Sequence, residues 1–179
     1  MPLVLLIGGA RSGKSALALR LAGQQDAPVV FVATAQARDG EMAERIATHA
    51  SERPASWQTV EEPLRLGEAI VAIDPGACVV LDCLTLWTAN ALEALGAREA
   101  EAQAVAAAGA AATRAGLTVV VTNEVGLGIV PDNVLARSYR DLLGRVNAIW
   151  AQAADDVYLL VAGRVLALAT TDSLRRLSP

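Results

Sequence analysis

The chain alternates between short apolar runs and longer stretches in which apolar residues recur every three to four positions, the period of a helix. Four of the short runs are almost continuously apolar: residues 3–7, 29–32, 78–81 and 117–121. Continuous apolar character is typical of strands that are covered on both faces, as in a parallel sheet. The longer stretches predict helices over residues 14–22, 40–52, 63–72 and 97–115. This alternation indicates a layered α/β protein.

The last part of the chain shows two further patterns. Residues 157–161 and 165–169 flank the turn Ala162-Gly163-Arg164, which predicts an antiparallel hairpin at the edge of the sheet. Before it, a helix is predicted from Val134, with one apolar stripe formed by Leu135, Tyr139, Leu142, Val146 and Trp150. We therefore expect one domain over residues 1–179, with an α/β three-layer fold, a largely parallel central sheet and a C-terminal antiparallel hairpin.

Charge and composition narrow the class of protein without naming a reaction. The formal net charge is -4, and no basic block suggests a nucleic-acid partner. No apolar stretch reaches the ~20 residues that a membrane span needs, and the short apolar N-terminus lacks the basic leader and cleavage site of a signal peptide. Cys78 and Cys83 are too few for a disulfide framework. We expect a cytoplasmic protein without stable membrane insertion.

The segment from Gly8 to Ser15 carries the first chemical signal. It matches the pattern G-x-x-x-x-G-K-S, and it lies between a predicted strand and a predicted helix, which is the context that this phosphate-binding loop requires. Its glycines let backbone N–H groups surround phosphates at a helix N-terminus, and Lys14 supplies a cation for the β and γ oxygens. Nucleotide binding is therefore predicted at Gly8, Gly9, Ala10, Arg11, Ser12, Gly13, Lys14 and Ser15.

A Mg²⁺ ion at such a loop is held by the Ser15 hydroxyl and by a carboxylate at the end of a neighbouring strand. Asp82 directly follows the apolar run 78–81 and is the predicted carboxylate. Its alternative role is to cap the helix that starts near Leu84. Glu124, which follows the next apolar run, is a second candidate for the metal site or for a general base.

The chain contains one histidine, His49, in the predicted helix 40–52. Met42, Ile46 and His49 share a face, so one reading is a histidine packed against the core. In the other reading, Arg45 and Arg53 flank the imidazole one turn before and after it, lower its pKa and bind phosphate oxygens. A neutral imidazole in that setting can attack the α-phosphorus of a nucleotide and form a nucleotidyl-histidine.

The combined motifs closely resemble one family, the bifunctional adenosylcobinamide kinase/adenosylcobinamide-phosphate guanylyltransferases of cobalamin biosynthesis. The resemblance covers nearly the whole chain. Besides the phosphate loop, it rests on residues 41–57, which include Arg45, His49 and Arg53-Pro54. It rests most specifically on residues 122–131, Thr-Asn-Glu-Val-Gly-Leu-Gly-Ile-Val-Pro, and on the segment that continues to Asn147.

The resemblance implies a reaction sequence, a nucleotide site and an assembly. The aminopropanol hydroxyl of adenosylcobinamide, a corrinoid, is phosphorylated from ATP or GTP, and GTP then donates GMP to that phosphate through guanylylated His49, with Mg²⁺ as cofactor. The implied fold is that of recombinase-type ATPases, assembled as a homotrimer. Further GTP contacts are implied at Thr34, Ala35, Gln36, Ala50, Ser51, Glu52, Arg53, at Glu61 or Glu62, and at Asp82.

The sequence differs from the family pattern at two positions, and two alternative functions are also consistent with its residues. Thr48 stands where a member of the family has the first histidine of a pair, and Asp82 stands where that member has Glu. One rival function is a small-molecule kinase with a single activity, in which His49 is structural. The other is a nucleotide-sensing regulator that binds GTP without turning over a corrinoid.

Overall fold

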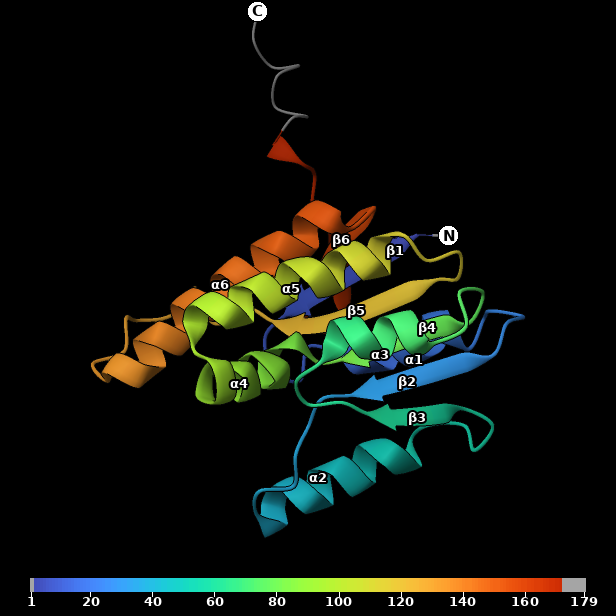
Figure 1. Cartoon of the computed structure of the whole chain (residues 1–179), viewed down its shortest axis with the longest axis horizontal. Helices are drawn as coiled ribbons and strands as arrows, with labels where there is room; N and C mark the ends of the chain where they lie inside the picture. Colours follow the sequence, from blue (N-terminus) through green and yellow to red (C-terminus); the bar gives the residue numbers. More distant parts are fainter. Residues whose placement is uncertain (1, 172–179) are drawn as a thin grey trace, which may run out of the picture.

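The computed structural model describes residues 2–171, so residues 1 and 172–179 of the predicted domain lie outside it. Its centre is a seven-stranded sheet in the order β3-β2-β4-β5-β1-β6-β7 (Figure 1). All neighbouring strands are parallel except β6 and β7, which form the predicted antiparallel hairpin. The strands are β1 (Leu3–Gly8), β2 (Val29–Ala33), β3 (Gln58–Glu61), β4 (Cys78–Asp82), β5 (Thr118–Asn123), β6 (Asp156–Val161) and β7 (Arg164–Ala167).

Helices cover both faces of the sheet, which confirms the predicted three-layer α/β fold. One face packs against α3, α4, α5 and α6, and the opposite face packs against α1. The small side chains Ala100, Ala104 and Ala107 bury one side of α5 against these neighbours. The helices are α1 (Lys14–Ala22), α2 (Gly40–Ser51), α3 (Leu66–Ala72), α4 (Leu84–Leu95), α5 (Ala97–Ala112) and α6 (Val134–Ala153). None of them is both long and apolar enough to cross a membrane.

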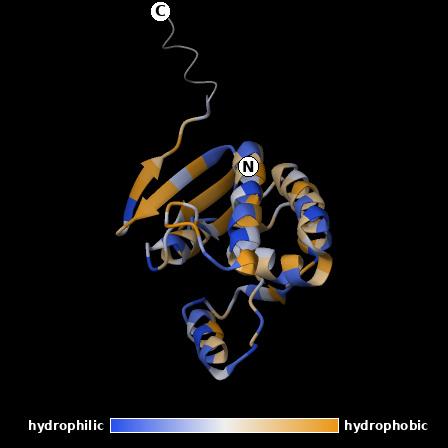
Figure 2. Cartoon of the chain, turned by 90° about the vertical axis from the view of Figure 1, so that its left-hand side faces the viewer, coloured by the Kyte–Doolittle hydropathy of each residue, from blue (hydrophilic) through white to orange (hydrophobic). Residues whose placement is uncertain are grey.

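Helix α2 does not belong to either layer. It begins at Asp39, whose carboxylate accepts a hydrogen bond of 2.7 Å from the Met42 amide, and none of its residues is buried. In Figure 1 it stands beside the edge strand β3, apart from the body of the protein, and in Figure 2 its ribbon carries both hydrophilic and hydrophobic residues. The expectation that His49 packs into the core is therefore wrong.

The edge strand β3 was not predicted from the sequence. β3 has four residues, mostly exposed, so it lacks the continuous apolar run of a central strand.

Helix α6 is only partly buried along its predicted apolar stripe. Leu142, Val146 and Trp150 are fully buried as predicted, but Leu135 at the start of the stripe is 67% exposed. The apolar stripe thus continues past the core onto the surface.

Candidate functional site

The phosphate loop connects β1 to α1 at the carboxyl edge of the sheet. Gly8 is buried so tightly that a Cβ there would lie 2.3 Å from the Leu160 carbonyl oxygen, and no other residue fits. Arg11 and Gly13 both have positive φ angles, of 56° and 99°. Left-handed residues between right-handed ones turn successive backbone N–H groups toward one point, which forms an anion-binding nest. The loop therefore has the shape that a phosphate requires.

Lys14 lies at the start of α1 with only 6% of its surface exposed. Its ammonium group donates hydrogen bonds to the carbonyl oxygens of Gly8 at 3.0 Å and Gly9 at 2.6 Å. Burial lowers the pKa of Lys14, and the nearby Asp82 carboxylate partly opposes this shift. A buried cation held mainly by neutral carbonyl groups is ready to accept an anionic partner, which a nucleotide phosphate supplies.

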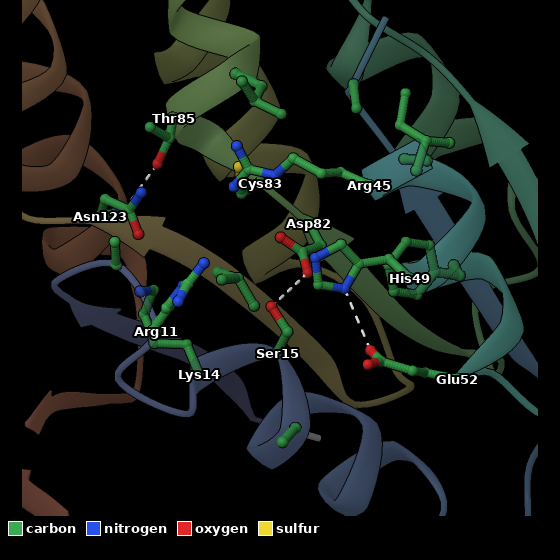
Figure 3. Close-up of a pocket in the computed structure, with 18 of the residues that line it drawn as sticks. Arg11, Lys14, Ser15, Arg45, His49, Glu52, Asp82, Cys83, Thr85 and Asn123 are labelled. Atoms are coloured by element: carbon green, nitrogen blue, oxygen red, sulfur yellow. Dashed lines mark hydrogen bonds and ion pairs between the residues drawn. The ribbon is translucent and has the colours of Figure 1, made fainter. Parts of the chain in front are cut away.

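The side chains of Ser15 and Asp82 are hydrogen-bonded to each other beside the phosphate loop. Asp82 ends β4, and its Oδ2 accepts a hydrogen bond of 2.8 Å from the Ser15 hydroxyl (Figure 3). Burial raises the pKa of Asp82, while the Ser15 hydrogen bond and the nearby His49, Lys14 and Arg53 lower it. The alternative role of Asp82 as a helix cap is wrong, because α4 begins after Cys83 without a side-chain cap. Two adjacent oxygen donors beside a phosphate loop fit Mg²⁺, which completes its shell with phosphates and water.

His49 reaches the same place from α2. Its side chain is 55% exposed, its ring points toward Asp82 and Ser15, and its Nδ1 lies 3.2 Å from Glu52 Oε2 (Figure 3). An ionised carboxylate only accepts hydrogen bonds, so Nδ1 carries the proton of a neutral ring and Nε2 keeps its lone pair. The structure therefore presents an oriented imidazole to the phosphate loop.

Arg53 ties the end of α2 to the sheet. Its Nε donates to the His49 carbonyl at 3.1 Å, its Nη1 donates to Thr59 Oγ1 at 3.1 Å, and its guanidinium lies 4.2 Å from the centre of the Phe31 ring. Arg45, one turn before His49, extends into the same cavity (Figure 3). Arg45 and Arg53 therefore line the same cavity as His49.

These groups line one cavity of about 630 Å³, with the phosphate loop on one side and α2 on the other. A second cavity of about 610 Å³ lies between α2 and the edge of the sheet, and Ala33, Ala35, Ile46 and Arg53 contribute to both. Of the predicted contacts, the first contains Ala10, Arg11, Ser12, Gly13, Lys14, Ser15, Ala35, His49, Glu52, Arg53 and Asp82. The second contains Ala35, Gln36, Ala50, Arg53 and Glu61.

Residues 4–168 match the family described as cobinamide kinase / cobinamide phosphate guanyltransferase. The chain belongs to this family. It is 46% identical over 176 residues to the bifunctional adenosylcobalamin biosynthesis protein CobU of Salmonella typhimurium, covering 90% of this chain and 96% of that protein. It is 42% identical over 160 residues to CobP of Pseudomonas aeruginosa, covering 89% and 92%. The resemblance inferred from the sequence is confirmed.

Solved structures of low sequence identity share the fold of this cobinamide kinase family member. An ATPase from the type III secretion system of pathogenic bacteria aligns with a TM-score of 0.59 and 12% identity, over 97% of this chain and 60% of that one. A Pyrococcus horikoshii protein aligns with a TM-score of 0.59 and 8% identity, over 95% and 87%. At this identity the likeness concerns the fold alone.

Several predicted contacts of this family member lie outside both cavities. Thr34 is fully buried, where its hydroxyl donates to the Cys83 carbonyl at 2.7 Å and accepts from the Cys83 amide at 2.9 Å. Ser51 bonds back to the Thr48 carbonyl within α2. Glu62 accepts from the amides of residues 64 and 65. Glu124 accepts from the Gly126 amide and does not line either cavity.

Two polar residues that line the first cavity, which we call the phosphate cavity, were not predicted from the sequence. Asn123 ends β5, the strand that lies between β4 and β1, and it lines the cavity together with Thr85 of α4. The Thr85 hydroxyl accepts a hydrogen bond of 2.8 Å from the Asn123 amide. Asn147, buried in α6, donates to the Asn123 carbonyl at 3.0 Å. Asn123 follows an apolar run, as Asp82 and Glu124 do, and this was the available signal. The sequence interpretation applied it to Asp82 and Glu124 but not to Asn123.

Proposed function

We propose that this chain phosphorylates adenosylcobinamide from ATP or GTP, and then transfers GMP from GTP to adenosylcobinamide phosphate through guanylylated His49. The family and the bifunctional relatives support the two activities. The observation that carries the mechanism is that Lys14 and His49 line the same cavity. Lys14 suits transfer of the γ-phosphoryl group, and His49 suits attack on the α-phosphorus.

For the kinase step, the triphosphate lies on the loop and the acceptor hydroxyl oxygen forms a bond to the γ-phosphorus. The bond from that phosphorus to the bridging β-phosphate oxygen breaks, which releases the nucleoside diphosphate, and the hydroxyl proton passes to solvent. Lys14 and the N–H groups of residues 9–15 bind and orient the phosphate oxygens, which accounts for most of the catalysis in such loops. Ser15 and Asp82 would hold Mg²⁺, which would neutralise part of the negative charge of the phosphates. Arg11, exposed on the loop and turned to the cavity, adds a further cation.

For the transferase step, Nε2 of His49 forms a bond to the α-phosphorus of GTP, and the bond from that phosphorus to the β-phosphate oxygen breaks to release pyrophosphate. Glu52 keeps the proton on Nδ1, so the nucleophilic lone pair stays on Nε2. An oxygen of adenosylcobinamide phosphate then attacks the same phosphorus, and the bond to nitrogen breaks. Arg45 and Arg53 stabilise the charge that develops on the phosphate oxygens.

We place the guanine in the second cavity. Glu61 lines it, and a carboxylate can accept hydrogen bonds from the N1–H and amino groups that distinguish guanine from adenine. Glu62 is less suited, because its Oε1 already accepts from the amides of Leu64 and Arg65. The predicted contacts Gln36 and Ala50 line the same cavity. This placement makes the transferase step specific for GTP.

The test compares His49→Ala with the wild type and with Thr48→Ala, a change on the same exposed helix. Each protein is incubated with adenosylcobinamide, Mg²⁺ and GTP that is radiolabelled at the α-phosphate, and the corrinoid products are separated. We expect the monophosphate and the GDP derivative from the wild type and Thr48→Ala, with label on the protein. We expect the monophosphate alone from His49→Ala.

A wild-type rate of GDP-derivative formation by His49→Ala would remove the nucleophile role. A wild-type product that stops at the monophosphate would instead identify a kinase with one activity. GTP binding without any corrinoid product would identify a regulator. The resemblance also implies a homotrimer in the cytoplasm, which we include in the proposal; sedimentation equilibrium of the purified protein tests the trimer.

A further inference from the structure

The loop between β5 and α6 carries an exposed apolar surface, which we call the loop patch. Leu127 and Ile129 are 88% and 97% exposed, and Val130 is 59% exposed. Val125 precedes them, and Val134 and Leu135 extend the surface onto the first turn of α6. Apolar side chains that gather in this way on a surface mark a binding site more often than single exposed residues do.

The loop patch starts beside the phosphate loop. β5 pairs with β1 so that Asn123 is level with Gly8, and the Glu124 amide donates to the Gly8 carbonyl at 3.2 Å. Asn123 itself lines the phosphate cavity. The far end of the loop is fixed by Arg137, which donates to the carbonyls of Pro131 and Asp132. The loop that carries the patch is therefore held at both ends, and its first residues, Asn123 and Glu124, adjoin the phosphate loop.

The tip of the loop also exposes polar backbone groups. Within residues 2–171, the N–H and C=O groups of residues 127–130 make no hydrogen bond to another residue. A ligand with apolar faces and an amide-bearing rim can contact the side chains and bind these groups at the same time. The corrin ring of cobinamide has this character, because its methylated periphery carries primary amides around an apolar macrocycle.

The size of the phosphate cavity also requires a separate place for the corrin ring. A cavity of about 630 Å³ is in the range that a single drug-sized ligand occupies. The ribose and triphosphate of the nucleotide take up much of that space, so the corrin macrocycle has to lie outside. Its reacting hydroxyl must nevertheless approach the γ-phosphorus to within about 3–3.5 Å. The loop patch suits both conditions, because none of its residues lines the cavity and the loop that carries it begins at the phosphate end of the cavity.

We propose that the loop patch binds the corrin ring of the acceptor, with the aminopropanol arm directed past Asn123 to the phosphate loop. This inference rests on the proposed kinase function, and it adds the place where the acceptor docks. A second copy of the chain is the competing occupant, since subunit contacts also bury apolar surfaces. The attachment of the patch to the phosphate edge favours the acceptor, because only the acceptor has to react there.

The test uses the full chain with Leu127 and Ile129 both changed to Ser, and Val71→Ser as the matched control on α3, where Val71 is 74% exposed. Adenosylcobinamide binding is measured by equilibrium dialysis, and kinase kinetics by product separation. We expect the Kd and KM for the corrinoid to rise at least about tenfold in the double variant, because two aliphatic contacts are lost. The KM for nucleotide and the values for Val71→Ser should match the wild type.

Hydrogen exchange of the wild type gives a readout that needs no variant. Adenosylcobinamide should slow exchange of the amides of residues 126–130. Unchanged corrinoid affinity in the double variant, or unchanged exchange in this segment, overturns the inference while the proposed function stands. Loss of oligomers with full corrinoid affinity overturns it too and identifies a subunit interface. A wild type that binds no adenosylcobinamide overturns both the inference and the proposed function.

Discussion

At the scale of single residues, burial changes the chemistry of several ionisable groups in this fold. Cys78 opens β4 in the middle of the sheet, and none of its surface is exposed. Burial raises the pKa of its thiol to about 11 from 9.0, and the nearby Arg114 partly opposes this. The thiol therefore stays protonated in the native protein at pH values where it ionises in the unfolded chain.

This difference predicts a loss of stability in alkali. Below pH 9 both states hold the proton and stability is unaffected; between pH 9 and about 11 only the unfolded chain releases it, so stability falls as pH rises. The contribution reaches about 2–3 kcal/mol at about 1.4 kcal/mol per unit. Urea unfolding from pH 8 to 10.5 should show a shallower fall for Cys78→Ala than for the wild type. Val79→Ala, its buried neighbour without an ionisable group, should keep the wild-type slope, and equal slopes for all three would contradict the assignment.

At the scale of elements, one arginine joins α3, α5 and β4. Arg114 follows α5 and is 8% exposed, and its guanidinium donates to the carbonyl oxygens of Ile70, Ile73, Asp74 and Ala77 at 2.8–3.2 Å. These carbonyls belong to the end of α3 and the turn into β4. The last carbonyl groups of a helix have no N–H partner within the helix. Arg114 supplies those donors from a distant part of the sequence.

Replacing Arg114 should therefore destabilise the fold without altering the site. We expect Arg114→Met to lower the free energy of unfolding by about 3 kcal/mol, because buried carbonyls lose charged donors. Arg98→Met, at an exposed position of α5, should change it by less than about 0.5 kcal/mol. Urea unfolding measures both. Kinase activity per folded molecule should be retained, and an Arg114→Met protein as stable as Arg98→Met would show that the hydrogen bonds contribute little.

The central elements could be predicted from the sequence because they are buried. β1, β2, β4 and β5 are apolar on both faces, so their runs are continuous, whereas the four-residue edge strand β3 has no such pattern. The contact of Ser15 with Asp82 also followed from the rule that parallel strands end at one edge. The role of Asn123 in the cavity was harder to predict, because its place after an apolar run was the only signal, and its contact with the cavity depends on β5 lying between β4 and β1.

At the scale of the whole molecule, His49 and the phosphate loop belong to parts of different stability. The loop grows out of the buried centre of the sheet, but α2 has no buried residue and does not contribute to the core clusters. Local unfolding should therefore release α2 at a much lower cost than the sheet.

Hydrogen exchange should show this difference directly. The amides of α2 should exchange long before those of β4 and β5, and His49→Ala should change the free energy of global unfolding by less than about 0.5 kcal/mol. Mass spectrometry of peptic fragments measures the first, with the α1 segment as an internal reference, and urea unfolding measures the second. Protection in α2 equal to that in β4 would mean that the helix is held by contacts beyond those of Arg53.

Lys14 and His49 are the only lysine and the only histidine in the chain, and they border the same cavity. A protein grown on isotope-labelled lysine and histidine would therefore give one side-chain NMR signal of each kind, without any need for assignment. The lysine signal would report when a triphosphate arrives, and the histidine signal would report when phosphorus becomes bonded to the ring. The two residues would thus report triphosphate binding and the proposed guanylylation of His49 in real time.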